Sequence, residues 1–596
     1  MYPINKKRLR YKKIWRILPI TIWQKLRMPN LSQIKRQRMM NFLAQIKDEH
    51  KDDDAMLKAL GEIESELNAK KYGLVWEEHE EAVDVKMSTH VPVFKEDTDK
   101  EITTAAGEFY NFLLEGDNLH SLRLLEKTHK DRIDVIYIDP PYNTGNRFTY
   151  SDENVDLNDT FRHSKWLSFM QARLRIAHSL LSERGIIFIS IDDNEQADLK
   201  LLCDEIFGED NFFTQIIVQS NKRGQTYKQI AKTHEYILVY TKTKDAEFNE
   251  VEKTAEDSDL NLVDGIGNYN VRELRNRNPK FGRFNRPNLF YAFYVNPQVV
   301  DKDGFCPVSL APSDEYSIQV FPYNSRGEES CWRWGTPLAA ANIDAETQVS
   351  NVVAKIKRDG GYNIYEKYRK TTYKAKSIWV ETEMITEHGT IQLGEMGLAF
   401  DFPKPVELIA KCLQIGSTPD SIVLDFFAGS GTTGQAVLEL NKKDNGKRKF
   451  ILCTNNENGI CENATYARLK TAISGKRIDG SQYSDGLPAN LKYYRTDFVS
   501  KDEEYLSDAL LEHIAEMIQL EHGVKLDGKR YVMVLDDDEA DELAAHWNEY
   551  SDVKALYVSK NVLFTTKQNA LFKNVEMHII PDYYFNFELR EVGETW

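Results

Sequence analysis

A short apolar run that ends at two prolines constrains the fold of this chain more than any other stretch. Residues 133–138 are apolar and rich in β-branched side chains, which predicts a buried strand. The run continues directly into Asp139, Pro140, Pro141 and Tyr142. Because paired prolines can neither extend a sheet ladder nor enter a helix interior, the backbone must leave the sheet rigidly here. We therefore expect a carboxylate, an unpaired carbonyl and an aromatic ring at the carboxyl end of a strand, where open α/β sheets bind ligands.

Such a corner suits group transfer to the exocyclic amine of a nucleobase. That nitrogen is a poor nucleophile, because its lone pair is delocalised into the ring. Asp139 and the carbonyl of Pro140 could each accept one of its N–H bonds and draw the nitrogen toward tetrahedral geometry. Tyr142 could stack on the base, which must first be flipped out of the duplex. The alternative is an ordinary strand-to-turn corner with a capping Asp, and the full run makes this alternative much weaker than Asp-Pro-Pro alone would.

A second chemical centre lies at residues 421–434, which predict a strand, a glycine-rich turn and the start of a helix. Gly429, Gly431 and Gly434 match the GxGxxG pattern of dinucleotide folds. However, Asp425 ends the strand just before the turn, where its carboxylate would repel a pyrophosphate. The same carboxylate could pair with the ammonium of a methionine-derived donor. The glycine pattern alone is also compatible with a nicotinamide-dependent oxidoreductase. The motif at residues 139–142 makes that alternative remote.

Taken together, the two centres resemble those of the β class of DNA amino-methyltransferases. The motif at 139–142 is similar to the form used for N6 of adenine. N4-cytosine relatives usually carry Ser in place of Asp139, so Asp139 favours adenine and leaves cytosine open. The resemblance covers about residues 110–500, with the base-binding centre first (115–240), a variable segment next and the donor-binding centre last (400–457). It implies S-adenosylmethionine as the methyl donor, direct displacement without a covalent enzyme intermediate, and no metal.

The resemblance also assigns roles to individual residues. It gives the catalytic roles to Asp139, Pro140, Pro141 and Tyr142, and the donor site to Asp117, Lys404, Asp425, Phe427, Gly429, Gly431, Thr432 and Glu457. For Asp117 the alternative is a helix N-cap. Glu457 is the nearest acid after a strand predicted at 448–454 and would accept the ribose hydroxyls, with Asn456 as the alternative. His234 and Glu235 resemble the family element beside the flipped base, and we assign neither a catalytic role.

The segment from 243 to 395 loses clear periodicity and mixes basic residues with aromatic ones, which can hold phosphates and read bases. An irregular insertion with an aromatic core is an equally good interpretation of its composition. In the resembled family this position holds the target recognition domain, which favours the first interpretation. The DNA contacts that we predict are Asn143, Arg272, Arg275, Arg277, Arg283 and Arg286.

The formal net charge of −16 argues, on its face, against a nucleic-acid partner. The distribution of the charge is compatible with such a partner, because residues 1–38 are basic and the acidic excess lies at 47–101 and after residue 500. No apolar run is long enough to span a bilayer. The six cysteines contain no CxxC pair, so we expect neither disulfides nor a zinc site and place the protein in a reducing cytoplasm.

We expect an α/β fold with a Rossmann-like, parallel, doubly wound sheet. The predicted divisions are 1–100 (a basic arm and a helical region), 101–242 (the catalytic half), 243–395 (target recognition), 396–500 (the S-adenosylmethionine-binding half) and 501–596 (a small acidic α/β domain). Strands are expected in the last at 530–535, 553–558, 562–565 and 577–580. With this tail the chain resembles the modification subunit of Type III restriction systems, which implies double-stranded DNA, a homodimer and a helicase–nuclease restriction subunit as partners. A non-catalytic DNA-recognition subunit is disfavoured, because both centres keep their key residues.

Overall fold

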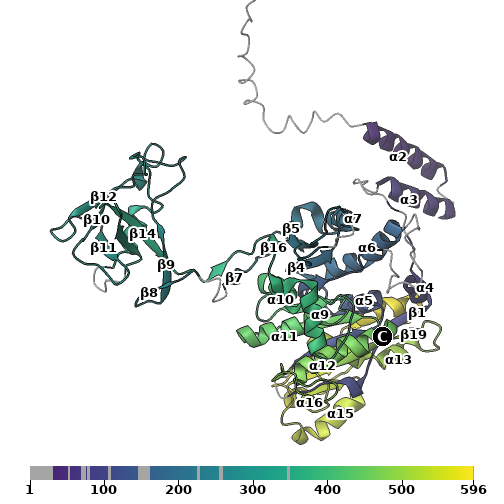
Figure 1. The fold of residues 1–596 in the computed structure, drawn as a ribbon. Helices are drawn as coiled ribbons and strands as arrows, with labels where there is room; N and C mark the ends of the chain where they lie inside the picture. Colours follow the sequence, from purple (N-terminus) through teal and green to yellow (C-terminus); the bar gives the residue numbers. More distant parts are fainter. Residues whose placement is uncertain are drawn as a thin grey trace, which may run out of the picture. The chain divides into compact units, whose positions relative to one another are not determined.

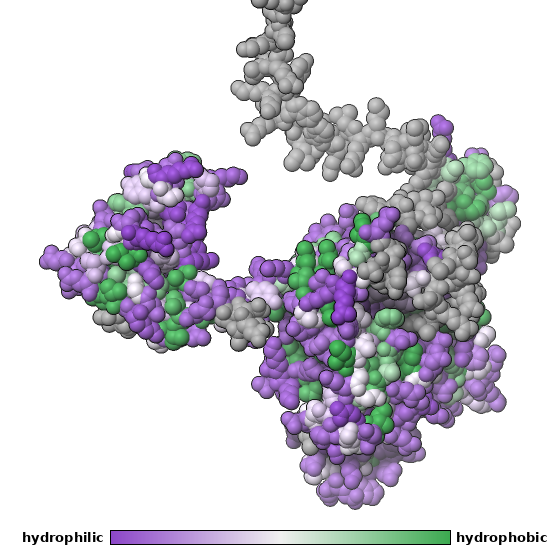
Figure 2. Space-filling view, in the orientation of Figure 1, coloured by the Kyte–Doolittle hydropathy of each residue, from purple (hydrophilic) through white to green (hydrophobic). Residues whose placement is uncertain are grey.

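The computed structural model describes residues 31–50, 54–68, 76, 79, 81–104, 109–144, 162–224, 229–253, 259–344 and 350–594 (Figure 1). The chain divides into two units, residues 1–76 and 77–596. In the first, helix α2 (Leu31–Glu49) packs on α3 (Asp54–Asn68), as the apolar spacing at 40–70 predicts. Figure 2 shows apolar side chains on the surface of this pair. Phe42 of α2 is largely exposed. The predicted basic arm lies mostly outside the described residues, none of whose helices is long and apolar enough to cross a membrane.

A ten-stranded mixed sheet forms the centre of the second unit, in the order β1-β19-β2-β18-β17-β3-β4-β6-β5-β16 (Figure 1). Six consecutive neighbours run parallel: β19 (Asn490–Ser500), β2 (Tyr110–Glu115), β18 (Lys449–Thr454), β17 (Ile422–Asp425), β3 (Ile133–Ile138) and β4 (Leu181–Ile191). Most of their residues are buried, which is typical of a parallel sheet covered on both faces. This part of the sheet confirms the predicted α/β architecture.

The sheet is not parallel throughout, which corrects our prediction. Strand β6 (Glu235–Thr241) runs antiparallel to both β4 and β5 (Phe212–Val218). An apolar strand buried on both faces has the same pattern in either direction, so its sequence does not reveal its direction. The described part of the connection from β5 to β6 contains no helix, and a connection without a crossover helix returns the chain antiparallel. At the edges, β1 (His90–Glu96) pairs antiparallel with β19, and β16 (Ile378–Trp379) runs parallel to β5.

The helices around the sheet follow the apolar spacing of the sequence. The helices predicted at 119–125, 166–181 and 406–413 are α5 (Asn118–Thr128), α6 (Arg162–Leu180) and α10 (Val406–Gly416). The remaining helices that surround the sheet are α4 (Ala82–Thr89), α7 (Gln196–Cys203), α9 (Thr386–Glu395), α11 (Thr432–Asp444) and α12 (Ala467–Ser474). Side chains of α10, α11 and α12 share one apolar cluster with β3, β17 and β18. The third glycine of the turn motif permits this packing, because a Cβ on Gly434 would lie 2.5 Å from Leu469 Cδ2 of α12.

The inserted segment forms its own seven-stranded antiparallel sheet, in the order β12-β10-β11-β13-β14-β9-β8. Its strands are β8 (Leu262–Val263), β9 (Asn268–Glu273), β10 (Phe293–Val295), β11 (Phe305–Ser309), β12 (Ile318–Val320), β13 (Val352–Ile356) and β14 (Tyr362–Tyr368), with the short helix α8 (Thr336–Ala341) beside them. Trp332, Phe293 and Cys306 lie in its core, so part of the aromatic content serves packing. The paired strands β7 (Val251–Glu252) and β15 (Thr372–Tyr373) lie on either side of this sheet in the sequence.

The C-terminal region contains a three-stranded parallel sheet of β20 (Tyr531–Val534), β21 (Ala555–Val558) and β22 (Glu576–Ile579). Its helices are α15 (Asp537–Ala545), α16 (Thr566–Leu571) and α17 (Asn586–Glu591), and α13 (Leu506–Leu511) and α14 (Ile514–His522) pack on the main sheet. The strand predicted at 562–565 is wrong. Thr565 instead caps α16, where its hydroxyl and the side chain of Gln568 form a capping box.

Candidate active site

Two neighbouring strands bring the two predicted centres to one edge of the sheet. Strands β3 and β17 run parallel, with Val135 opposite Val423. Asp139 follows β3 and Asp425 ends β17, so both carboxylates lie at the carboxyl end of the sheet. This is the edge where open α/β sheets bind their ligands. The two acids are 286 positions apart in the sequence but lie on neighbouring strands in the fold.

Four side chains meet where β3 exits the sheet. The hydroxyl of Tyr142 donates to Asp139 Oδ1 at 2.7 Å. The ammonium of Lys404 donates to the Tyr142 hydroxyl at 2.7 Å and to Glu235 Oε2 at 2.8 Å, and it lies 3.5 Å from Asp139 Oδ1. Asp139 and Tyr142 come from the exit of β3, Glu235 begins β6 and Lys404 precedes α10. We call these four residues the base corner.

The base corner holds two acids and one cation, of which Lys404 and Glu235 are nearly buried and Asp139 is partly exposed. Burial raises the pKa of Asp139, the Lys404 ammonium opposes this shift and Glu235 adds to it. Burial alone would lower the pKa of Lys404, but the two carboxylates outweigh it and raise that pKa. Burial and both acids raise the pKa of Tyr142 well above its ordinary value, so its hydroxyl stays protonated and can donate. With both acids ionised, the corner has a net charge of −1.

The side chain of Lys404 lies in the base corner, where it pairs with Glu235. We predicted Lys404 as a donor-site residue, yet its side chain belongs to the base corner and only its carbonyl reaches the glycine-rich turn, where it accepts from the Thr432 hydroxyl at 3.1 Å. Glu235 was predicted to belong to the family element beside the flipped base, without a catalytic role. The sequence signal for its pairing was an acid at the first position of an apolar strand, because an acid that becomes buried there needs a partner.

The glycine-rich turn has the conformation that its residues require. Gly429 and Gly431 have φ values of 49° and 77°, in the left-handed region that favours glycine. A Cβ on Gly429 would also lie 3.3 Å from the ring of Phe400. The Thr465 hydroxyl holds the turn by donating to the carbonyl of Gly429 at 2.6 Å. Thr432 then begins α11, so the turn leads directly into a helix N-terminus.

Asp425 is a buried carboxylate with neutral hydrogen-bond partners. It accepts from the backbone N–H of Phe427 at 3.0 Å and from the Thr433 hydroxyl at 2.5 Å. Burial raises its pKa to about 7, against these two hydrogen bonds. Within the described part of the chain, no Lys, Arg or His forms an ion pair with it. A buried carboxylate without a cationic partner suits a cationic ligand, as we predicted from the sequence.

Arg468 is a residue of the donor centre that the sequence did not reveal. Its fully buried guanidinium donates to the hydroxyls of Ser430 at 3.1 Å and Thr432 at 2.6 Å, and to Gln435 Oε1 at 2.7 Å. Burial lowers its pKa to about 10, so it remains a cation at neutral pH. Its hydrogen bonds to Ser430 and Thr432 fix the glycine-rich turn. An Arg within a helical apolar pattern gives no sequence signal of this contact.

The remaining donor-site residues lie at neighbouring strand ends. Asp117 follows β2 and is the N-cap of α5, where its carboxylate accepts from the backbone N–H of Leu119 at 2.7 Å, as the capping alternative predicted. Glu457 follows β18 and is exposed. Asn456, the alternative to Glu457, donates to Glu115 Oε1 at 3.0 Å. Since β2 and β18 are parallel neighbours, these residues share the edge of the sheet that carries Asp425.

The predicted DNA contacts differ in their surroundings. Most of the arginines have carboxylate partners: Arg272 pairs with Glu366, Arg275 and Arg277 with Glu273, and Arg283 with Glu329. Arg286 is exposed, and its guanidinium lies 5.1 Å from the ring centroid of Phe281. Asn143 is buried and its amide donates to Glu195, which favours a role in fixing the loop over contact with DNA. The basic segment is therefore less positive than its arginine count indicates.

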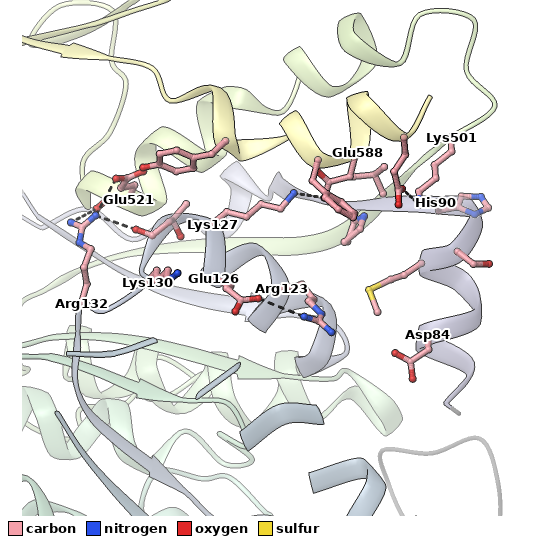
Figure 3. A pocket seen from close by; sticks show the side chains of 18 of the residues that line it. Asp84, His90, Arg123, Glu126, Lys127, Lys130, Arg132, Lys501, Glu521 and Glu588 are labelled. Carbon is pink, nitrogen blue, oxygen red and sulfur yellow. Dashed lines mark hydrogen bonds and ion pairs between the residues drawn. The ribbon is translucent and has the colours of Figure 1, made fainter. Parts of the chain in front are cut away.

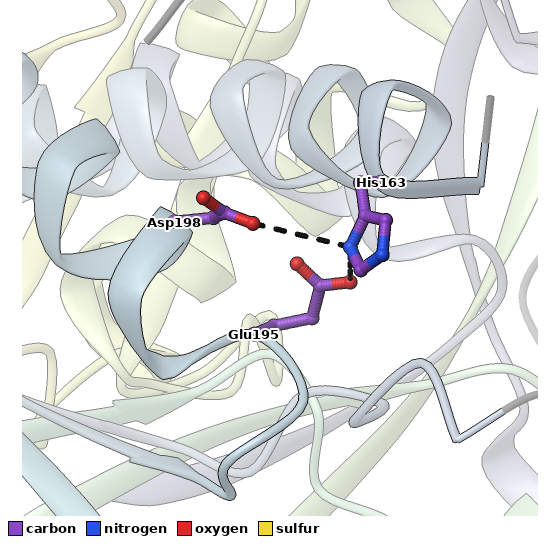
Figure 4. A group of neighbouring side chains, drawn as sticks. All are labelled: His163, Glu195 and Asp198. Atoms are coloured by element: carbon purple, nitrogen blue, oxygen red, sulfur yellow. Dashed lines mark ion pairs between the residues drawn. The ribbon is translucent and has the colours of Figure 1, made fainter. Parts of the chain in front are cut away.

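Two other features lie outside these centres. His163, Glu195 and Asp198 each offer a donor atom within 4.8 Å of the others (Figure 4). Since His163 already pairs with Glu195, we assign no metal to them. A cavity of about 980 Å³ is lined by β1, α5 and α17, and its charges pair with one another, for example Lys127 with Glu588 (Figure 3). It contains no residue of either centre.

Comparison with known proteins agrees with this geometry. The DNA methylase family model matches residues 133–466, more than half of the chain, and the chain belongs to this family. S-adenosylmethionine, the cofactor of this family, is the one that we predicted. The chain is 37% identical over 393 residues to the Type II methyltransferase M.KpnI of Klebsiella pneumoniae, covering 64% of this chain and 90% of that protein.

The chain is also similar to Type III modification subunits. It is 34% identical over 451 residues to the EcoPI Mod subunit of Escherichia phage P1, covering 68% of this chain and 66% of that protein, so it spans about two thirds of this relative. Among solved structures it resembles the PvuII cytosine-N4-specific DNA methyltransferase (TM-score 0.30, 12% identity, 58% of this chain and 83% of that one). It also resembles TTHA0409 of Thermus thermophilus (TM-score 0.30, 13% identity, 64% and 99%).

Proposed function

We propose that this chain is a DNA methyltransferase that transfers the methyl group of S-adenosylmethionine to N6 of an adenine flipped out of double-stranded DNA. The observation that carries the proposal is the placement of the base corner and the glycine-rich turn at the ends of the neighbouring strands β3 and β17. An amine acceptor bound at one centre faces a methyl donor bound at the other. Transfer then depends on positioning and electrostatics.

The base corner is suited to an amine that becomes positively charged. Asp139 and the carbonyl of Pro140 accept the two N–H bonds of N6, and the adenine replaces the hydrogen bond that Tyr142 now gives to Asp139. The net charge of −1 stabilises the cation that develops on N6 during transfer. Asp139 is the nearest acceptor for the proton that N6 must then lose, and its raised pKa favours this role. The Lys404 ammonium opposes that shift and so favours the ionised form of Asp139 that binds N6.

The donor centre fits S-adenosylmethionine, which supplies an electrophilic methyl group on a sulfonium. Asp425 would hold the donor's ammonium, because it is a buried carboxylate that lacks a cationic partner within the described residues. Gly429 and Gly431 would allow the backbone to approach the donor closely, since any side chain at Gly429 would meet Phe400. Asp117 and Glu457 are assigned to the donor's adenine and ribose by the family resemblance.

The inserted antiparallel domain would read the target sequence. Arg283 and Arg286 lie in an exposed segment that also presents the side chain of Phe284, and such a mixture suits phosphates and bases. The similarity to Type III modification subunits supports a homodimer that works in the cytoplasm with a helicase–nuclease restriction subunit in a restriction–modification system. N4-cytosine methylation is the second candidate, because the same corner could hold the amine of cytosine.

A methyl-transfer assay tests the proposal. Purified protein is incubated with methyl-labelled S-adenosylmethionine and genomic DNA that lacks adenine methylation, and the nucleosides are then separated. We expect the label in N6-methyladenosine. Label in N4-methylcytosine would replace adenine as the target, and DNA without label despite bound donor would contradict catalysis by this chain alone.

A further inference from the structure

We infer that Glu195 is a positioning residue for methyl transfer: together with His163 it clamps the exit of the catalytic motif through the side chain of Asn143. The inference rests on the proposed function, because it concerns how Tyr142 is held in the base corner. Glu195 immediately precedes α7, whereas His163 lies in the first turn of α6. The clamp therefore joins three separate segments of the chain.

Glu195 contacts the exit of the catalytic motif through Asn143. It follows Tyr142 directly, has a left-handed backbone with φ of 52°, and is buried. Its amide donates to Glu195 Oε1 at 2.5 Å and to the carbonyl of Arg162 at 3.4 Å. His163 Nδ1 lies 2.6 Å from the same carboxylate oxygen of Glu195, and Figure 4 shows the two side chains pointing toward each other.

The hydrogen-bond partners define the tautomer of His163. The Nε–H of Arg162 donates to His163 Nε2 at 3.2 Å, so that nitrogen carries the lone pair. His163 Nδ1 lies 2.6 Å from Glu195 Oε1, within ion-pair distance, although its geometry gives it no hydrogen bond among the described residues. Two hydrogen bonds and one ion-pair contact therefore link Arg162, through His163 and Glu195, to Asn143.

A second anchor holds the other side of Tyr142. The indole Nε1–H of Trp166 donates to the carbonyl of Pro141 at 2.7 Å. Trp166 is buried and lies on α6, the same helix that carries His163. The residues immediately before and after Tyr142 are thus both fixed to α6 or its partner Glu195. Loss of either anchor would leave Tyr142 free to shift within the base corner.

The ionised form of Glu195 lowers the stability of the folded protein. Its side chain is fully buried, and its Oε2 has no hydrogen-bond partner among the residues that the structure describes. Burial raises its pKa to about 7, with Asn143 and His163 opposing the shift and Asp198 of α7 adding to it. Because the pKa is higher in the folded protein than in the unfolded chain, stability is lost as the pH rises from about 4.5 to about 7. A residue that costs stability beside a catalytic motif is typical of a functional position.

The decisive experiment compares Glu195→Gln with the wild type, using Glu205→Gln as a matched control. Glu205 follows α7 and is half exposed, with Arg175 3.7 Å away. We expect Glu195→Gln to lower kcat by about 10- to 100-fold, the usual cost of a small misplacement, while the Kd for S-adenosylmethionine stays within about twofold. Its free energy of unfolding should equal or exceed that of the wild type above pH 7. Glu205→Gln should match the wild type in all three quantities.

The pH profile and a second variant separate positioning from a merely structural effect. We expect kcat of the wild type to rise from pH 6 to pH 8 as Glu195 ionises, and this rise to shrink in Glu195→Gln. Asn143→Gly keeps the left-handed backbone but removes the side chain that donates to Glu195, so we expect it to lower kcat by a similar factor. We expect kcat of the double variant to be no lower than that of either single variant. Additive losses in the double variant, or wild-type kcat and pH profile in Glu195→Gln, would overturn the clamp.

Two further outcomes have a defined meaning. Wild-type activity that is lost with a chelator and restored by a divalent cation would overturn the clamp, because His163, Glu195 and Asp198 would then be acting as a metal site. If the wild type transfers no methyl group to any DNA while binding the donor, the proposed function fails and the clamp fails with it. If the wild type is active and Glu195→Gln equals it, the clamp alone fails.

Discussion

Replacing Asp425 with Asn removes a charge from the donor centre while keeping the shape of the side chain. Burial raises the pKa of Asp425 from an ordinary value of 3.8 to about 7. The folded protein therefore keeps a proton that the unfolded chain releases, and stability falls as the pH rises from about 4 to about 7. One pKa unit corresponds to about 1.4 kcal/mol, so an ionised Asp425 costs the folded protein about 4 kcal/mol above pH 7.

The variant should be more stable than the wild type at high pH. Its amide oxygen can still accept from the backbone N–H of Phe427, and its amide nitrogen can donate to the Thr433 hydroxyl. We therefore expect Asp425→Asn to raise the free energy of unfolding above pH 7, by at most about 4 kcal/mol, and the difference to disappear near pH 4. Urea unfolding at the two pH values measures this.

Donor binding should change in the opposite direction. If only the ionised carboxylate pairs with the donor's ammonium, the competent fraction falls from about three quarters at pH 7.5 to about one tenth at pH 6, so the apparent Kd rises about eightfold. Asp425→Asn should bind at least about tenfold more weakly than the wild type at pH 7.5 and lose this pH dependence. Calorimetry with S-adenosylmethionine measures both. A wild-type Kd that is equal at the two pH values, or a variant that binds as tightly as the wild type, would refute the reasoning.

Three further predictions concern packing, the base corner and DNA. Gly434→Ala should destabilise the protein by about 1–3 kcal/mol in urea, because the added methyl group meets the side chain of α12, whereas Gly394→Ala in α9 meets nothing within 4 Å and should stabilise it by about 0.5–1 kcal/mol. Lys404→Met removes the cation that lowers the pKa of Asp139, so the acidic limb of the kcat profile should move to higher pH in steady-state assays. Arg286→Ala should weaken DNA binding equally across sequences and reduce the salt slope in filter binding by about 1. Equal stability of the two glycine variants, an unmoved profile or an unchanged slope would each contradict the corresponding argument.

The sequence predicts the parts of the fold that depend on local patterns. Strands β3 and β17 are recognisable because a β-branched run stops abruptly, at two prolines in one case and at a glycine-rich turn in the other. Helices α5, α6 and α10 follow from apolar spacing, since each buries one face. The direction of β6 could not be predicted, because a strand buried on both faces has no pattern that depends on its direction.

The candidate site was predictable only in its motif residues. Asp139, Tyr142 and Asp425 belong to short motifs whose chemistry can be inferred from neighbouring residues. Lys404 and Glu235 are 169 residues apart, and they pair only because the fold brings the residue before α10 to the start of β6. Asp139 and Asp425 lie at the ends of the adjacent strands β3 and β17, which the order of the two motifs along the chain does not reveal.

The same limit applies to the groups that hold the motifs in place. Arg468 and Glu195 lie outside both motifs, and each is an ordinary polar residue within its own helix pattern. Their contacts with Thr432 and Asn143 connect elements distant in sequence. Whether a charged group is buried is decided only when these elements pack together. The sequence therefore indicates the catalytic and donor-binding residues better than the residues that hold them in place.

The central claim is that the two centres perform separable tasks at one edge of the sheet. The most direct test measures donor binding and methyl transfer in the same preparation of Asp139→Asn. Within the described residues, the hydrogen bond and ion pair of Asp139 are with Tyr142 and Lys404, and its charge is the smallest of the influences on the pKa of Asp425. The account therefore predicts a Kd for S-adenosylmethionine within about twofold of the wild type and a rate of transfer to DNA lower by about 10³-fold or more. Transfer at the wild-type rate would contradict the role of the base corner, and loss of donor binding together with transfer would contradict the separation of the two centres.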